Sequence, residues 1–153
     1  MRHLALALLA IALPTLALAD EHKLSQVTLE RTGCFGTCPA YKVTIKSDGT
    51  VIYHGEAFVE HIGDYKAKLY FGCLEFLSAS LDKLGFWRLK TSYSAGSMTD
   101  LPTEYITAVS DLGTQKIREY GQGGPIELWM SLTLVDGLLS DAREWKKVGP
   151  KKS

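Results

Sequence analysis

The sequence lacks an excess of charge of either sign. Its 17 Lys and Arg residues are matched by 17 Asp and Glu residues, so the formal net charge at pH 7 is zero. Domains that bind nucleic acid or anionic membranes usually carry a strongly basic surface. We therefore expect neither nucleic acid nor a charged membrane surface as the partner.

The sequence also lacks the short motifs that mark common catalytic sites. It contains no G-x-S-x-G, no H-E-x-x-H, no phosphate-binding glycine loop and no histidine pair at zinc-binding spacing. Asp100, in a long polar loop, is the best acid for a hydrolase, but no partner base accompanies it in the sequence. The pattern favours a protein that is not an enzyme.

Long apolar runs are absent after residue 19. Residues 1–3 supply a positive start, residues 4–13 an apolar run and residues 17–19 a small-residue end, the layout of a cleavable signal peptide. The apolar run is shorter than the ~20 residues that a transmembrane helix needs. We predict an exported protein, periplasmic or extracellular, with no transmembrane helix after cleavage. An uncleaved N-terminal anchor is the alternative.

Cleavage after Ala19 would make Asp20-Glu21-His22 the new N-terminus. This segment resembles the amino-terminal copper and nickel motif, in which an amine, two peptide nitrogens and an imidazole enclose a square-planar ion. His22 is therefore a weak metal candidate. We predict that residues 20–25 form a flexible end.

Two hydrophobic periodicities divide the rest of the chain. Alternation with period two predicts strands, and spacings of three and four predict helices. The predicted strands cover residues 24–31, 41–46, 50–54, 65–69, 104–109 and 115–120, and residues 57–62 either continue the strand at 50–54 or restart it after Gly55. The predicted helices cover residues 70–84 and 125–142. Strands and helices do not alternate one by one. We therefore expect an α+β fold with a mainly antiparallel sheet of about five to six strands and two amphipathic helices on one face.

This predicted fold forms a single domain over residues 26–147, followed by a basic tail at residues 148–153. Within it, Asp48-Gly49 joins two strands. A two-residue turn would put Val51 on the lysine side of the sheet, whereas a three-residue loop with a left-handed Gly49 sets Val51 opposite Ile45. We predict the three-residue loop. The aromatic residues expected in the core include Tyr53, Phe58, Trp87 and Trp129.

Only three cysteines are present, and two of them, Cys34 and Cys38, enclose a short loop that contains glycine. In an oxidising compartment such a pair is most simply a disulfide that holds the loop tip in one shape. Three cysteines permit three single pairings, which the sequence leaves open. Because Cys73 lies beside the leucines of a predicted helix, we expect it to be a buried free thiol.

The alternative for Cys34 and Cys38 is a thiol-based copper-binding or redox protein. The pattern C-x3-C-P is similar to the copper-binding loop of the Sco-type thioredoxin-like proteins, and thiolates favour Cu(I). That fold needs a parallel βαβ core, which this sequence does not predict. His61 is a weak candidate for a further ligand. We predict no cofactor, with copper as the alternative.

Several motifs together resemble an uncharacterised bacterial family of small exported domains. The resemblance spans nearly the whole chain after residue 19 and implies a fold and an exported setting, but no activity. It rests on C-F-G-T-C-P-x-Y at residues 34–41, the strand-Asp48-Gly49-strand unit, T-D-L-P-T at residues 99–103, and Tyr120-Gly121 followed by Pro125, Leu128 and Trp145.

The preferred hypothesis is a non-enzymatic, monomeric binding module whose partner is an unknown envelope protein or a small ligand. Loops held by a rigid scaffold often carry recognition. Here two loops qualify, the cysteine loop and the polar loop around Asp100. The candidate recognition residues are Arg31, Phe35, Thr37, Tyr41, Thr99 and Asp100.

Counting free thiols separates the two hypotheses. In protein purified from the exported compartment and then denatured, we expect one free thiol among the three cysteines. A Cys34–Cys38 pair that glutathione readily reduces, or that takes up Cu(I) stoichiometrically, would favour the copper or redox alternative.

Overall fold

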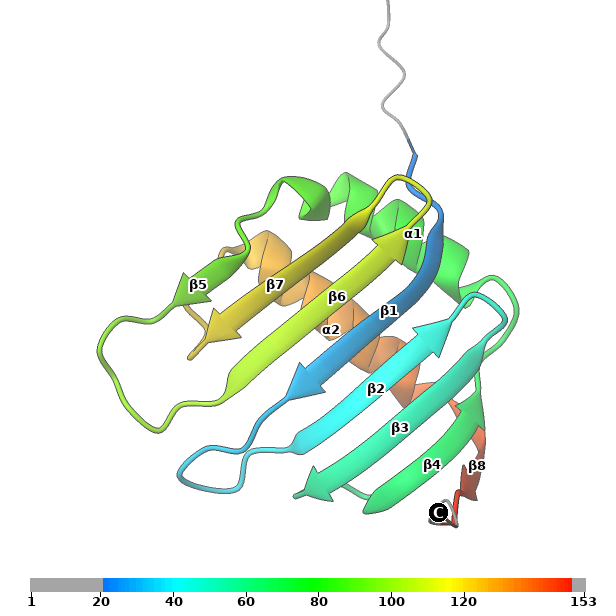
Figure 1. The fold of residues 1–153 in the computed structure, drawn as a ribbon, viewed down its shortest axis with the longest axis horizontal. Helices are drawn as coiled ribbons and strands as arrows, with labels where there is room; N and C mark the ends of the chain where they lie inside the picture. Colours follow the sequence, from blue (N-terminus) through cyan, green and yellow to red (C-terminus); the bar gives the residue numbers. More distant parts are fainter. Residues whose placement is uncertain (1–20, 150–153) are drawn as a thin grey trace, which may run out of the picture.

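The computed structural model describes residues 21–149, and Figure 1 shows their arrangement as one sheet with two helices behind it. The elements follow one another as β1 Leu24–Arg31, β2 Ala40–Lys46, β3 Thr50–Ala57, β4 Gly63–Lys68, α1 Cys73–Lys83, a 3₁₀ turn Phe86–Arg88, β5 Ser92–Ser94, β6 Thr103–Ser110, β7 Thr114–Tyr120, α2 Ile126–Ser140 and β8 Arg143–Lys147. The predicted signal peptide and the end of the predicted basic tail lie outside the described residues.

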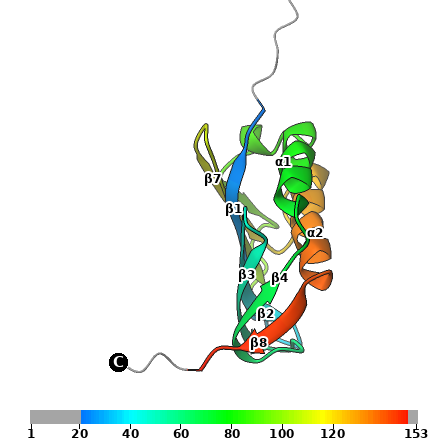
Figure 2. The same cartoon turned by 90° about the vertical axis from the view of Figure 1, so that its right-hand side faces the viewer.

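The eight strands form one sheet in the order β5-β7-β6-β1-β2-β3-β4-β8. Neighbouring strands pair antiparallel except β5 and β7, which are parallel. Both helices cover the same face of the sheet, as the edge-on view in Figure 2 shows. The predicted α+β class and the two helices on one face are confirmed. No helix within residues 21–149 is long and apolar enough to cross a membrane.

The strand count differs from the prediction because both edge strands lack an alternating apolar pattern. β5 has three residues, and β8 carries Trp145 as its only large apolar side chain. The predicted strand at residues 57–62 is wrong beyond Ala57. There the chain turns between β3 and β4, and Phe58 has a φ of 54°.

The predicted three-residue loop between β2 and β3 is confirmed. Ile45 pairs with Val51, and Gly49 has a φ of 74°. The amide of Gly49 donates to the carbonyl of Lys46 at 2.9 Å. A side chain at this position would also lie 2.8 Å from the carbonyl oxygen of Leu69. Glycine therefore satisfies both the backbone conformation and the close approach of the neighbouring strand.

The core lies between the sheet and the two helices. Strand side chains that face the helices are almost wholly buried, among them Val27, Val43, Ile106 and Ile117. On the helices, the fully buried leucines are Leu74, Leu77, Leu81, Leu128 and Leu132. Gly85, just after α1, has a left-handed conformation with a φ of 68°, as is common where helices end.

Two of the aromatic residues predicted for the core lie instead on the surface. Phe58 is 59% exposed because it sits in the turn after β3, and Trp129 is 51% exposed because α2 turns it away from the sheet. Tyr53 is buried, and Trp87 and Trp145 pack partly against the core.

The described N-terminal residues are packed rather than extended away from the domain. The His22 ring stacks on Trp87 with centroids 4.0 Å apart, and its Nδ1 lies 2.7 Å from Oδ1 of Asp82. β1 begins at Leu24, which is 8% exposed. Ordered packing therefore reaches into residues 20–25, where the sequence predicted a flexible end.

Removing a core side chain from α2 tests this two-layer packing. We expect Leu132→Ala to lower the free energy of unfolding by about 2–5 kcal/mol, because Leu132 is 1% exposed and its loss leaves a cavity. Met130, on the outer side of the same helix, is 43% exposed. Met130→Ala should therefore change stability by less than about 1 kcal/mol. Equal losses in urea unfolding would contradict this placement of α2.

Candidate functional site

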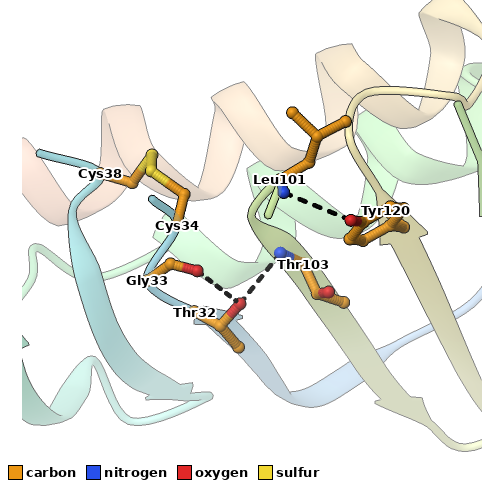
Figure 3. The surroundings of a disulfide bond; sticks show 7 residues. All are labelled: Thr32, Gly33, Cys34, Cys38, Leu101, Thr103 and Tyr120. Carbon is orange, nitrogen blue, oxygen red and sulfur yellow. Dashed lines mark hydrogen bonds between the residues drawn. A yellow bond between two sulfur atoms is a disulfide. The ribbon is translucent and has the colours of Figure 1, made fainter. Parts of the chain in front are cut away.

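A disulfide joins Cys34 and Cys38 in the connection from β1 to β2 (Figure 3). The two Cα atoms lie 5.6 Å apart, within the usual range for a disulfide. Cys73 is a buried free cysteine at the start of α1, and burial raises the pKa of its thiol. The predicted pairing is therefore the one that the structure contains.

The disulfide loop is bonded to the loop around Asp100. The amide of Phe35 donates to the carbonyl of Asp100 at 3.1 Å. Thr32 and Thr103 exchange two further bonds: the Thr32 amide donates to the Thr103 carbonyl, and the Thr103 amide donates to Oγ1 of Thr32, each at 2.9 Å. Figure 3 shows the second of these beside the disulfide. The two loops predicted as recognition elements thus form one continuous surface.

Two hydrogen bonds of Tyr120 hold the loop around Asp100 in place. Its hydroxyl donates to the carbonyl of Met98 at 2.9 Å and accepts from the amide of Leu101 at 3.3 Å. Asp100 itself has a φ of 65°, and its carboxylate accepts a hydrogen bond from Thr99. A conformation with positive φ is one that aspartate tolerates better than most residues. Among residues 21–149, the Asp100 carboxylate forms no ion pair or hydrogen bond with a basic side chain.

The candidate recognition residues divide into two groups. Phe35, Thr37, Thr99 and Asp100 are exposed on the surface that the two loops share, and Phe35 is 93% exposed. Arg31 and Tyr41 lie on the helix side of the sheet instead. There they pair with each other across β1 and β2 and reach Asp136 on α2.

Arg31 is the centre of a cluster of polar residues, which we call the Arg31 cluster. Its guanidinium forms ion pairs with Glu104 on β6 and, at 2.6 Å, with Asp136 on α2. The Tyr41 hydroxyl donates to the other oxygen of Asp136 and accepts from Nε of Arg31 at 3.2 Å. Arg31 and Glu104 are largely buried, with side chains 20% and 10% exposed. This cluster ties three strands to one helix.

The charges of the Arg31 cluster reinforce one another. Burial alone lowers the pKa of Arg31, but the Asp136 carboxylate and Tyr41 more than offset it, so the pKa of Arg31 is raised overall. Burial raises the pKa of the Tyr41 hydroxyl well above its usual value, and Asp136 raises it further. Arg31 therefore stays charged and Tyr41 stays a neutral donor at physiological pH.

A further carboxylate adjoins the Arg31 cluster. Glu119 on β7 pairs with Glu104 across the sheet and is 3% exposed. Its Oε1 accepts a hydrogen bond from the amide of Gly124 at 2.8 Å, whereas Oε2 has no partner among the described residues. Glu104 and Glu119 are thus neighbouring buried carboxylates at this end of the sheet.

The Arg31 cluster was not predicted from the sequence, although the strand pattern contained a signal for it. Arg31 continues the alternation of Val27 and Leu29 on the buried face of β1. Glu104 occupies the same face as Ile106, and Glu119 the same face as Ile117. Charged residues at the buried positions of three strand ends require partners from one another or from the helix.

A groove opens beside the Arg31 cluster, between the end of α2, the β3–β4 turn and β8. We call it the α2 groove, and its volume is about 370 Å³. Pro39, which follows the disulfide, contributes to one side. Its other walls include Tyr41, Tyr53, Glu60, His61, Asp136 and Trp145.

Gly55 allows the β3–β4 turn to fold over the sheet and close one side of the α2 groove. A side chain there would overlap the His61 carbonyl oxygen and lie 2.8 Å from the Val59 side chain. His61 consequently packs among aromatic rings, stacked on Tyr65 at 4.8 Å and tilted against Trp145 at 4.4 Å. This packing fixes the position of a residue that the sequence left unplaced.

The weak metal candidates lie in separate places. His22 contacts Asp82 and Trp87 at the start of β1, whereas His61 lies in the α2 groove. Cys34 and Cys38 are bonded to each other. Within residues 21–149, no three His, Cys, Asp or Glu side chains gather as a metal site would require.

The fold and this site define a small α+β domain in which a disulfide-closed loop rests on a second loop, above a buried arginine. Comparison with known families assigns it further. The chain belongs to the family described as a domain of unknown function, DUF6438, whose model matches residues 25–139. No curated protein matches the chain in sequence.

Replacing the arginine tests how much the Arg31 cluster stabilises the domain. We expect Arg31→Met to lower the free energy of unfolding by about 3–5 kcal/mol, because it leaves Glu104 as a buried charge without a partner. Lys42→Met is the matched control. It removes an exposed ion pair with Glu30 and should cost less than about 1 kcal/mol. Chemical denaturation that gives equal losses would contradict a structural role for the cluster.

Proposed function

We propose that the protein is an exported, non-enzymatic binding module that recognises another protein of the cell envelope. The surface formed by the disulfide loop and the Asp100 loop makes the contact. The near-complete exposure of Phe35, at 93%, on a covalently closed loop is the observation that carries the proposal.

An exposed phenylalanine at this position favours a partner for two physical reasons. Removing such a side chain from water is favourable by roughly 1.5–3 kcal/mol, and the free domain leaves it in water. The disulfide and the bond from the Phe35 amide to Asp100 already hold the loop, so binding orders little additional backbone. Aromatic side chains presented in this way often dominate the energy of an interface.

Export is the second part of the proposal, and it is supported by two features of the sequence. Residues 1–19 have the layout of a signal peptide, and disulfides persist in oxidising compartments. A Cys34–Cys38 bond contributes to recognition only where it stays oxidised. Periplasmic or extracellular residence is therefore part of the same proposal.

Photo-crosslinking in the producing cells tests the recognition surface. A photoreactive residue at Thr37, beside Phe35, should give a discrete protein adduct. Phe35→Ala in the same chain should strongly reduce this adduct while leaving thermal stability nearly unchanged, because Phe35 makes few contacts.

The matched control places the photoreactive residue at Phe71, which is 94% exposed and lies just before α1. The proposal requires the adduct from position 37 to be absent from position 71. Identical adducts from both positions, or an adduct from position 37 that survives Phe35→Ala, would contradict it.

A further inference from the structure

The α2 groove has the dimensions of a small-molecule site. Its volume of about 370 Å³ lies within the range of ~300–1,000 Å³ that ligand pockets span. It shares no lining residue with the exposed surface around Phe35. A function of this groove is therefore independent of the proposed protein-binding surface.

The charge of the α2 groove has one sign. Its ionisable lining includes the carboxylates of Glu60 and Asp136, and none of its described lining residues is Lys or Arg. Arg31 lies beneath Asp136 and also pairs with Glu104. Arg31 compensates much of the Asp136 charge, so Glu60 supplies most of the negative charge that remains among the lining residues, which disfavours anions.

The walls of the α2 groove are aromatic. Trp145 meets Tyr53 edge to face with centroids 5.3 Å apart, and His61 lies against both rings. The faces of such rings attract cations, most strongly tryptophan, then tyrosine and phenylalanine. Exposed Phe58 adds a further ring at the rim.

One tyrosine hydroxyl at the α2 groove has no partner within residues 21–149. Tyr53 is only 5% exposed, and its hydroxyl makes no hydrogen bond with any residue in the described range 21–149. By contrast, the Tyr41 hydroxyl donates to Asp136, and the Tyr93 hydroxyl accepts from the backbone amide of Lys90. Since Tyr53 lines the groove, its hydroxyl is available to a molecule bound there.

We propose that the α2 groove binds a small organic cation, an ammonium group carried on a short apolar or hydroxylated chain. The ammonium lies against the aromatic walls and is attracted by the Glu60 carboxylate, and Tyr53 bonds a polar atom on the chain. The same ammonium chemistry occurs in free amines and in lysine side chains of proteins, including methylated ones.

Binding of choline to the purified protein tests the proposal. The indole N–H signals of the three tryptophans are followed by NMR, with Trp145→Phe used to assign the one in the groove. Choline should shift the Trp145 signal saturably. Its neutral isostere 3,3-dimethyl-1-butanol, in which carbon replaces nitrogen, should bind at least about ten-fold more weakly because it lacks the cation–π and carboxylate attraction.

Two variants with matched charge changes locate the site. Glu60 is exposed at the groove, so Glu60→Gln should weaken choline binding several-fold without affecting folding. Glu56, also exposed, lies on β3 outside the groove, and Glu56→Gln should leave binding unchanged. Tyr53→Phe, which removes only the free hydroxyl, should weaken choline more than tetramethylammonium.

Further ligands show whether the ammonium comes from a free amine or from a lysine side chain, and whether the groove prefers an anion or a sugar. A peptide with trimethyllysine that binds as choline does, or better, supports the proposal and indicates a protein source. The proposal is overturned if the isostere binds as tightly as choline, if acetate or methyl β-glucoside shifts Trp145 at lower concentration, or if no cation shifts it at tens of millimolar. A negative crosslinking result at Thr37 would contradict the proposed protein-binding surface but not the binding of a cation in the α2 groove.

Discussion

A buried guanidinium joins the two layers of the domain at one end of the sheet. Arg31 on β1 pairs with Glu104 on β6 and with Asp136 on α2, and Tyr41 on β2 donates to the same Asp136. Burying charge is unfavourable unless each charge is paired and hydrogen-bonded. The strands and the helix must therefore keep their relative positions for the charges to remain satisfied. This requirement holds the C-terminal half of α2 in place over the sheet, beside the α2 groove.

The Arg31 cluster also constrains the loop that contains the disulfide. Arg31 and Tyr41 are partners across β1 and β2, and the connection between them contains the Cys34–Cys38 bond. The loop is thus closed twice, by paired and hydrogen-bonded residues at its base and by a covalent bond nearer its tip. Phe35 projects from this rigid connection on one side, and Pro39 borders the α2 groove on the other. One anchored segment consequently supports two surfaces that differ in chemistry.

Periodicity in the sequence was sufficient for most of the fold. It predicted the central strands, both helices and the β2–β3 register, because each of these elements buries one apolar face. It missed β5 and β8, whose residues are mostly polar, and it placed Phe58 and Trp129 in the core because aromatic residues are usually buried. The disulfide followed from local spacing. The α2 groove did not, since its walls come from β2, β3, α2 and β8, which only the tertiary fold brings together.

A double-mutant cycle between Arg31 and Asp136 tests the central claim most directly. Arg31→Met, Asp136→Leu and the double variant are unfolded in urea beside the parent protein, and the coupling free energy is taken from the four stabilities. A direct bond that ties β1 to α2 predicts a favourable coupling of about 1–3 kcal/mol, within the range seen for residues in contact. Effects that add to within about 0.5 kcal/mol would show that the two residues act independently and would contradict the account.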